Sequence, residues 1–256
     1  MRDDWPLHRA GAVVFDCDST LSAIEGIEYL ARQHRSEIEQ LTDAAMRGEV
    51  PLEDVYARRL ELVRPDRDQV EALGRAYVDA LVEDAVAVIA ALRAEGIAVR
   101  VVSGGLLPPV AFLASHIGIE DGAVAAVDIA FDASGAYAGF DTESPLARSG
   151  GKAEVIRGWR KQMRGPIVLV GDGATDLEAA DAVDLFIAFA GVVDRPAVTS
   201  AADAVVRSHS LAPVLPIVLS GMAPASPEHS AIFEKGLRLL DAATQIRLLE
   251  KPRNEE

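Results

Sequence analysis

The chain has 256 residues, half of them hydrophobic, and a formal net charge of −15. That length suits one sizeable domain with a smaller insert. The acidity argues against nucleic acid or an anionic membrane as the main partner, because both require a basic surface. A small anionic substrate stays open, since a local group of N–H donors can bind phosphate within an acidic protein.

Cysteine usage and hydropathy predict a cytoplasmic protein. The chain has one cysteine, Cys17, so an internal disulfide is excluded and a reducing compartment is expected. Residues 1–10 carry two acids and no apolar core, so we expect no signal peptide. The apolar stretches are short and interrupted by charge, so no transmembrane helix is expected.

Helices and strands are predicted to alternate along most of the chain. A short apolar run at residues 11–15 predicts a buried strand that ends in acids. Residues 22–77 are charged and have helical spacing, which predicts an inserted helical cap. The later expected elements are a helix at 84–95, a strand at 97–102, a turn at 103–105, a helix at 107–117, a hairpin within 124–140, a helix at 151–163, a strand at 166–170 and a strand at 184–189.

This alternation predicts an α/β fold with a doubly wound, Rossmann-like parallel sheet covered by helices on both faces. We expect a catalytic core from residues 1–21 and 78–220 and a cap from residues 22–77. Residues 221–256 are expected to form a linker and an amphipathic helix at 231–249. That helix packs either on the core or on a second subunit, so a homodimer is one of two alternatives.

Polar clusters follow four predicted strand ends or the turns after them. They are Asp16 with Asp18, Ser103 with Gly104 and Gly105, Lys152, and Asp172 with Asp176. Ligands of open α/β sheets bind outside the carboxyl ends of the strands, so we expect these clusters to converge on one site.

The acids predict a metal site. Asp16 and Asp18 would repel each other unless they share a metal ion or a proton. With Asp172 they form a set of hard oxygen donors of the kind that Mg²⁺ prefers. The alternative, that Asp16 and Asp18 only cap a following helix, does not account for Asp172.

The remaining clusters are typical of phosphate binding. Ser103 and two glycines let backbone N–H groups approach an anion, although such a segment is often only a turn. Lys152 opens a helix, where its charge opposes the helix dipole, which suggests that it contacts an anionic ligand. A nucleotide P-loop is excluded because Ala153 stands where serine or threonine is needed. A phosphocysteine mechanism on Cys17 lacks its arginine, because position 23 is Ala23.

The motifs and their order resemble the haloacid dehalogenase-like phosphatases, over about residues 11 to 210. The cap residues and the run from Tyr137 to Asp141 are most similar to members that hydrolyse O-phospho-L-serine. Arg47 beside Met46, and Ile24 before Glu25, depart from the pattern of some relatives. The matching segments are Phe15-Asp16-Cys17-Asp18-Ser19-Thr20, Glu25-Gly26-Ile27, Ala45-Met46 with Val50-Pro51, Arg59-Leu60, Ser103-Gly104-Gly105, Tyr137-Ala138-Gly139-Phe140-Asp141, Ser149-Gly150-Gly151-Lys152 and Gly171-Asp172-Gly173-Ala174-Thr175-Asp176.

The resemblance implies a chemical role for each catalytic residue. Asp16 would be the nucleophile, and Asp18 the general acid and later the base. Mg²⁺ would be held by Asp16, the main-chain carbonyl of Asp18, and Asp172. The groups expected to hold the phosphoryl oxygens are Ser103, Gly104, Gly105 and Lys152.

The resemblance also implies which residues bind the rest of the substrate. Glu25 would meet the substrate ammonium, and Arg59 its carboxylate. Met46 would pack in the cap, and Thr175 would lie near the seryl end. Thr20 and Asp176 would support the site from behind.

The expected reaction is therefore hydrolysis of O-phospho-L-serine, the last step of L-serine biosynthesis. One alternative keeps the phospho-aspartyl step but transfers the group to another acceptor or acts on another small phosphomonoester. A second alternative is a catalytically silent phosphoserine-binding module, which would lack a nucleophile, an acid or a metal ligand.

Overall fold

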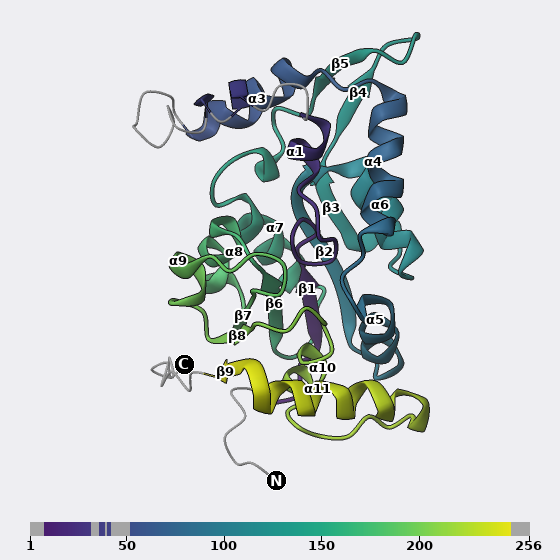
Figure 1. The fold of residues 1–256 in the computed structure, drawn as a ribbon, viewed down its shortest axis with the longest axis vertical. Helices are drawn as coiled ribbons and strands as arrows, with labels where there is room; N and C mark the ends of the chain where they lie inside the picture. The colour runs from purple at the N-terminus through teal and green to yellow at the C-terminus, as the bar shows by residue number, and fades with distance from the viewer. Residues whose placement is uncertain (1–7, 32–35, 39, 42–51, 247–256) are drawn as a thin grey trace.

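The computed structural model describes residues 8–31, 36–38, 40–41 and 52–246 (Figure 1). Its main sheet has seven strands in the order β3-β2-β1-β6-β7-β8-β9. Their bounds are β1 Ala12–Phe15, β2 Ala98–Leu106, β3 Val124–Val127, β6 Ile167–Gly171, β7 Leu185–Phe189, β8 Ala204–Val206 and β9 Thr244–Ile246.

All neighbouring pairs from β3 to β8 are parallel, and β9 joins the edge antiparallel to β8. The prediction of a doubly wound parallel sheet is therefore confirmed. β1 lies between β2 and β6, so the strand order reverses at the centre of the sheet. Ligands bind in the crevice at such a reversal, beyond the carboxyl ends of the strands.

Helices cover both faces of this sheet, with α5 and α6 on one side of the view and α7, α8 and α9 on the other (Figure 1). The helices outside the cap are α5 Ala85–Ala94, α6 Leu107–His116, α7 Gly151–Arg160, α8 Ala174–Glu178, α9 Pro196–Thr199, α10 Val214–Val218 and α11 Ser230–Ala243.

Alternate residues of β1 enter two different hydrophobic clusters. Val13 and Phe15 belong to the cluster under α5 and α6, whereas Ala12 and Val14 belong to the cluster under α7. All four side chains are fully buried, and their burial on both faces explains why the segment reads as a continuous apolar run. β1 is therefore a rigid central support for the residues that follow it.

Two local predictions on this side of the sheet were wrong. Residues 103–105 are not a turn, because β2 continues through them to Leu106, with an irregular register against β3. Residues 124–127 do not belong to a hairpin but form β3 at the sheet edge. The hairpin is shorter, with β4 at Ile129–Phe131 and β5 at Tyr137–Phe140.

The described part of the expected cap contains α1 (Gly26–Leu30), α3 (Leu52–Val63) and α4 (Arg67–Asp79). α4 starts as expected, with Asp66 and Gln69 forming a reciprocal capping box. α4 packs along α6, and α3 lies beside the β4–β5 hairpin, where Tyr56 meets Phe140 edge-on at 5.4 Å between ring centroids. The inserted block is thus attached to the core on two sides.

The C-terminal helix is shorter than predicted. α11 ends at Ala243, and Thr244–Ile246 forms β9 rather than continuing the helix. The Phe233 and Leu240 side chains are buried in the core cluster, and Lys235 pairs with Glu83 and Asp84. The helix therefore packs on the core, one of the two alternatives, and the homodimer stays a prediction.

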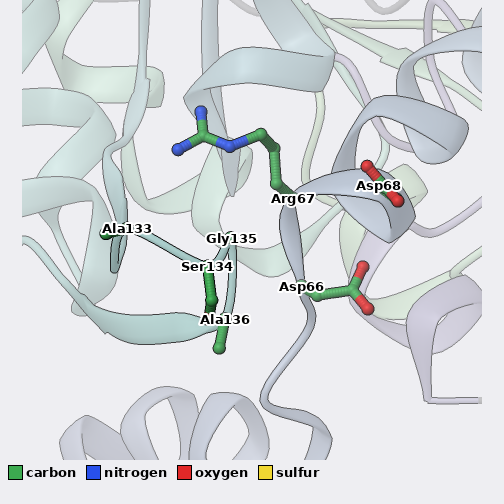
Figure 2. Close-up of a pocket in the computed structure, with 7 residues that line it drawn as sticks. All are labelled: Asp66, Arg67, Asp68, Ala133, Ser134, Gly135 and Ala136. Carbon is green, nitrogen blue, oxygen red and sulfur yellow. The ribbon is translucent and has the colours of Figure 1, made fainter.

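In the described residues, no helix combines the length and the apolar character needed to cross a bilayer. A pocket of about 330 Å³ lies where the first turn of α4 meets the β4–β5 turn (Figure 2). It is lined by Asp66, Arg67, Asp68 and residues 133–136, none of which belongs to the predicted polar clusters.

Candidate active site

The four polar clusters meet at the carboxyl ends of β1, β2 and β6. Asp16 follows β1 directly, Ser103 lies within β2, and Asp172 follows β6. Asp16, Ser103 and Asp172 are 6%, 0% and 4% exposed. Parallel pairing of β1 with both β2 and β6 brings these three residues to one edge of the sheet.

Lys152 reaches this edge from the first turn of α7. Its Nζ lies 2.9 Å from Oδ1 of Asp16 and 2.8 Å from Oδ1 of Asp176. The other oxygen of Asp176 accepts a hydrogen bond from the Gly173 N–H at 3.0 Å. Lys152 therefore faces two carboxylates of the chain, and its contact with an anionic ligand stays a prediction.

Asp18 points toward the inserted block. Its Oδ1 accepts hydrogen bonds from the Tyr77 hydroxyl at 2.6 Å and from the Gly26 N–H at 2.7 Å. Its Oδ2 lies 3.5 Å from the Ser103 hydroxyl oxygen. The Ser103 hydroxyl in turn accepts a hydrogen bond from the Gly105 N–H at 3.0 Å.

Asp172 connects the core to Glu25 through Arg195. Arg195 Nε donates to Oδ2 of Asp172 at 2.9 Å, and its Nη2 donates to Oε1 of Glu25 at 3.0 Å. The same Glu25 oxygen accepts a hydrogen bond from Ser19 at 2.7 Å. Thr20 donates to Oδ1 of Asp172 at 3.3 Å, and its supporting role in the reaction stays a prediction.

Three carboxyl groups of the site, those of Asp16, Asp18 and Asp172, have raised pKa values. Burial, followed by the charge of Asp176, raises the pKa of Asp16 well above its usual range. Burial and nearby Glu25 raise the pKa of Asp18 to about 6, and burial with Asp176 raises that of Asp172 to about 6. Burial is the largest cause of each shift, and the charges of neighbouring carboxylates add to it.

Lys152 stays charged despite its burial. Burial alone lowers the pKa of an ammonium group, but Asp16 and Asp176 outweigh that effect and raise the pKa of Lys152 above its usual value. A permanent cation beside Asp16 suits the binding of a phosphoryl group, which carries negative charge.

A close group of carboxylates in this site fits a divalent cation. Oxygens of Asp16, Asp172 and Asp176 all lie within 4.8 Å of one another. These are hard carboxylate donors, as Mg²⁺ and similar ions require. This cluster contains the predicted carboxylate ligands Asp16 and Asp172 together with Asp176. The Asp18 carboxylate accepts hydrogen bonds from Tyr77 and Gly26, and the main-chain carbonyl of Asp18 stays a predicted ligand.

The other predicted residues lie on elements around this cluster. Glu25 precedes α1, Arg59 lies on α3, and Thr175 is an exposed residue of α8. Gly104 lies in β2 beside Ser103. Met46 lies outside the described residues, so its expected position in the cap stays a prediction.

Two residues of this network were not predicted from the sequence. Arg195 lies in the segment that follows β7, so the rule that placed the other clusters beyond strand ends also covers it. Tyr77 lies near the end of α4, and its sequence context is that of an ordinary core position. Only the packing of α4 shows that its hydroxyl faces Asp18.

Comparisons with known proteins give a consistent result. Residues 13–181 match the haloacid dehalogenase-like hydrolase family. The chain is 38% identical to phosphoserine phosphatase of Mus musculus over 189 residues, which cover 73% of this chain and 84% of that protein. Identity to phosphoserine phosphatase of Bos taurus is also 38%, over 76% of this chain and 88% of the other. A solved structure described as a phospho-aspartyl intermediate analogue of phosphoserine phosphatase is 25% identical, with a TM-score of 0.67, and the match covers 82% of this chain and 99% of that one.

Proposed function

This chain belongs to the haloacid dehalogenase-like hydrolase family, and on that basis we propose that it hydrolyses O-phospho-L-serine to L-serine and phosphate, the last step of L-serine biosynthesis. The observation that supports this most is the buried Asp16–Lys152–Asp172 arrangement at the centre of the sheet, in a chain 38% identical to phosphoserine phosphatases over most of its length.

In the proposed reaction Asp16 is the nucleophile. Its carboxylate oxygen attacks phosphorus, the bond from phosphorus to the seryl oxygen breaks, and that oxygen takes a proton from Asp18. Asp18 then removes a proton from water, whose oxygen attacks the phospho-aspartyl group and releases phosphate. Both steps restore Asp16 and Asp18 to their starting forms, so the cycle closes without another reactant.

Fixed donors around Asp16 hold the phosphoryl oxygens in this account. They are the Ser103 hydroxyl, the Gly104 N–H and the Lys152 ammonium, and Gly105 contributes through its N–H, which donates to the Ser103 hydroxyl oxygen at 3.0 Å. Donors that are already in place need no reorganisation as the charge on the phosphoryl oxygens changes. Asp176 orients Lys152 by accepting its hydrogen bond at 2.8 Å.

The metal in this proposal is Mg²⁺, held by Asp16, Asp172 and the main-chain carbonyl of Asp18. When bound, it neutralises charge on the phosphoryl oxygens. Asp176 places a third carboxylate beside Asp16 and Asp172. Thr20 keeps Asp172 in position through its hydrogen bond.

The cap supplies specificity for the amino-acid part of the substrate. Glu25 binds the ammonium group, Arg59 binds the carboxylate, and Met46 and Thr175 contact the remainder. Support comes from the position of Glu25, which is connected to the metal-site residue Asp172 through Arg195.

Two further parts of the proposal concern the whole chain. We propose that it is divided into a core, a cap and a C-terminal helix, and that the protein is cytoplasmic.

A phosphate-release assay with Mg²⁺ tests the proposal. We expect O-phospho-L-serine to be hydrolysed faster than phosphothreonine or glycerol phosphate. Glu25→Gln should raise KM for O-phospho-L-serine by about 10- to 100-fold, because it removes a charged partner of the ammonium, and should change turnover of glycerol phosphate much less.

Equal turnover of all three monoesters would contradict the assignment to phosphoserine. Transfer of phosphate to an added alcohol in preference to water would favour a phosphotransferase. Glu28→Gln, which alters another acid of the same segment, is the matched control for Glu25→Gln.

A further inference from the structure

Asp18 is held in one orientation by groups of the inserted block. Tyr77, on α4, donates to Oδ1 of Asp18 at 2.6 Å, and the Gly26 N–H donates to the same oxygen at 2.7 Å. The other oxygen, Oδ2, lies 3.5 Å from the Ser103 hydroxyl, on the side of the phosphate-binding groups. The two oxygens of this carboxyl therefore have different surroundings.

The Tyr77 side chain is fixed on all sides. It is fully buried, and its ring belongs to the core cluster on that face of the sheet. Its main-chain carbonyl accepts a hydrogen bond from the Ser22 hydroxyl at 3.0 Å. A hydroxyl carried by a ring packed in this way has one position available, because core side chains are close-packed.

Two glycines leave room for this hydroxyl. A Cβ atom at Gly26 would lie 2.1 Å from the Tyr77 oxygen, and one at Gly105 would lie 3.4 Å from it and 3.0 Å from Oδ2 of Asp18. A side chain at position 26 is thus incompatible with Tyr77 in its present place. The close contact between Tyr77 and the Asp18 carboxyl group therefore depends on small residues at positions 26 and 105.

We propose that Tyr77 is a positioning residue for the reaction: its hydroxyl anchors Oδ1 of Asp18 so that Oδ2 faces the phosphoryl group and carries the transferred proton. The inference rests on the proposed function, because it assumes that Asp18 is the acid and base of that reaction. Small misplacement of a proton donor lowers the rate of the chemical step with little effect on substrate binding, and the Tyr77 hydroxyl acts on that donor because it donates to Oδ1 of Asp18.

The test compares kcat and KM of Tyr77→Phe with those of the wild type at saturating Mg²⁺. We expect kcat to fall by about 10- to 100-fold, while KM changes by less than about threefold. Tyr137→Phe is the matched control, because it removes the hydroxyl of another buried tyrosine, on the β4–β5 hairpin, and should keep kcat within about twofold of the wild type. Wild-type kcat in Tyr77→Phe, or a change in KM alone, would overturn the inference.

A second variant covers the case in which Tyr77→Phe folds poorly. Gly26→Ala keeps Tyr77, but the added methyl group pushes its hydroxyl, and the ring that carries it, away from their present place, so this variant should also lower kcat at nearly constant KM. In the Tyr77→Phe background, Gly26→Ala should lower kcat by a smaller factor than in the wild type, because the Tyr77 hydroxyl that it displaces is absent there. Additive losses in kcat from the two changes would contradict the coupling.

Failure of the proposed function gives a different result. If the wild type hydrolyses another phosphomonoester but not O-phospho-L-serine, the substrate assignment is wrong, and the same comparison of kcat and KM is made on that monoester. If the wild type hydrolyses no phosphomonoester, both the function and the role of Tyr77 are overturned.

Discussion

The ammonium nitrogen of Lys152 lies 2.9 Å from Oδ1 of Asp16, and both side chains are at least nine-tenths buried. The same nitrogen lies 2.8 Å from Asp176. Lys152 thus compensates the charges of two buried carboxylates that lie close together. In the proposed reaction it also binds the substrate phosphate. Structure and catalysis depend on the same contact.

Replacing this lysine should therefore affect both stability and rate. Lys152→Met leaves Asp16 and Asp176 without their cation, and breaking a buried pair costs about 3–5 kcal/mol of unfolding free energy. We expect that loss in urea unfolding without added metal, together with a fall in kcat of at least about 100-fold. Lys161→Met, at an exposed position after α7, is the control. A Lys152 variant as stable as the control would contradict this account of the site.

Divalent cations should stabilise the protein more at neutral than at acidic pH. The folded-state pKa values of Asp18 and Asp172 are about 6, above the usual value of 3.8. Between about pH 4 and pH 6 the folded protein then binds more protons than the unfolded chain, so these groups lower stability as pH rises through that window. A bound cation compensates the charge of the ionised carboxylates. At a hundredfold excess over Kd, it raises the unfolding free energy by about 2.7 kcal/mol.

Thermal unfolding at about pH 5 and about pH 7.5, with Mg²⁺ or with a chelator, measures this effect. The rise in Tm caused by Mg²⁺ should be larger at the higher pH. Asp172→Asn should remove most of it, and the exposed Asp181→Asn should not. An equal rise in Tm at both pH values would show that the Asp172 carboxyl group does not bind the ion.

Arg195 should weaken cation binding while it supports substrate binding. Its guanidinium contacts Asp172 and Glu25 at 2.9 and 3.0 Å, so its charge opposes a cation nearby. In Arg195→Gln, which lacks this charge, the Kd for Mg²⁺ should be about threefold lower or more. Calorimetry without substrate measures this Kd. KM for O-phospho-L-serine should rise about tenfold, because Glu25 loses a partner that holds it.

Arg207→Gln is the control for Arg195→Gln. Arg207 pairs with Asp194 at 3.1 Å, next to Arg195 in the chain, so it tests for a general loss of positive charge in this region. Weaker Mg²⁺ binding in the Arg195 variant would contradict the electrostatic argument.

Packing of α11 on the core should stabilise the whole chain. Phe233 is 4% exposed in the core cluster, and Phe233→Ala should lower the unfolding free energy by about 3 kcal/mol. Phe112, which is 51% exposed on α6, gives the matched control, and Phe112→Ala should cost less than about 1 kcal/mol. Similar losses in the two variants would indicate that α11 is only loosely attached.

The predicted parts of the site are those that depend on strand ends. Asp16, Ser103 and Asp172 lie at adjoining strands because a parallel sheet brings its carboxyl ends to one edge. Tyr77 depends instead on how α4 packs, and local spacing in the sequence contains no information on which atom its hydroxyl meets.

The errors in secondary structure have a similar origin. Ser103 to Gly105 suggested a turn because glycines are frequent there, but pairing with neighbouring strands keeps them extended in β2. Thr244–Ile246 follows the helical pattern of the preceding residues, yet it pairs with β8, which lies some forty residues earlier in the chain. Where a strand or helix such as β2 or α11 ends is decided by pairing with distant segments and not by local propensity.

Trapping the phospho-enzyme is the most direct test of the central proposal, that Asp16 forms a covalent intermediate. O-phospho-L-serine and Mg²⁺ are mixed with the wild type and with Asp16→Asn, quenched in acid within the first turnover, and analysed by mass spectrometry of the peptide that contains residue 16. We predict one phosphoryl group on Asp16 in the wild type, and neither that group nor phosphate release in the variant. Continued phosphate release by Asp16→Asn, or a phosphoryl group on another residue, would contradict the account.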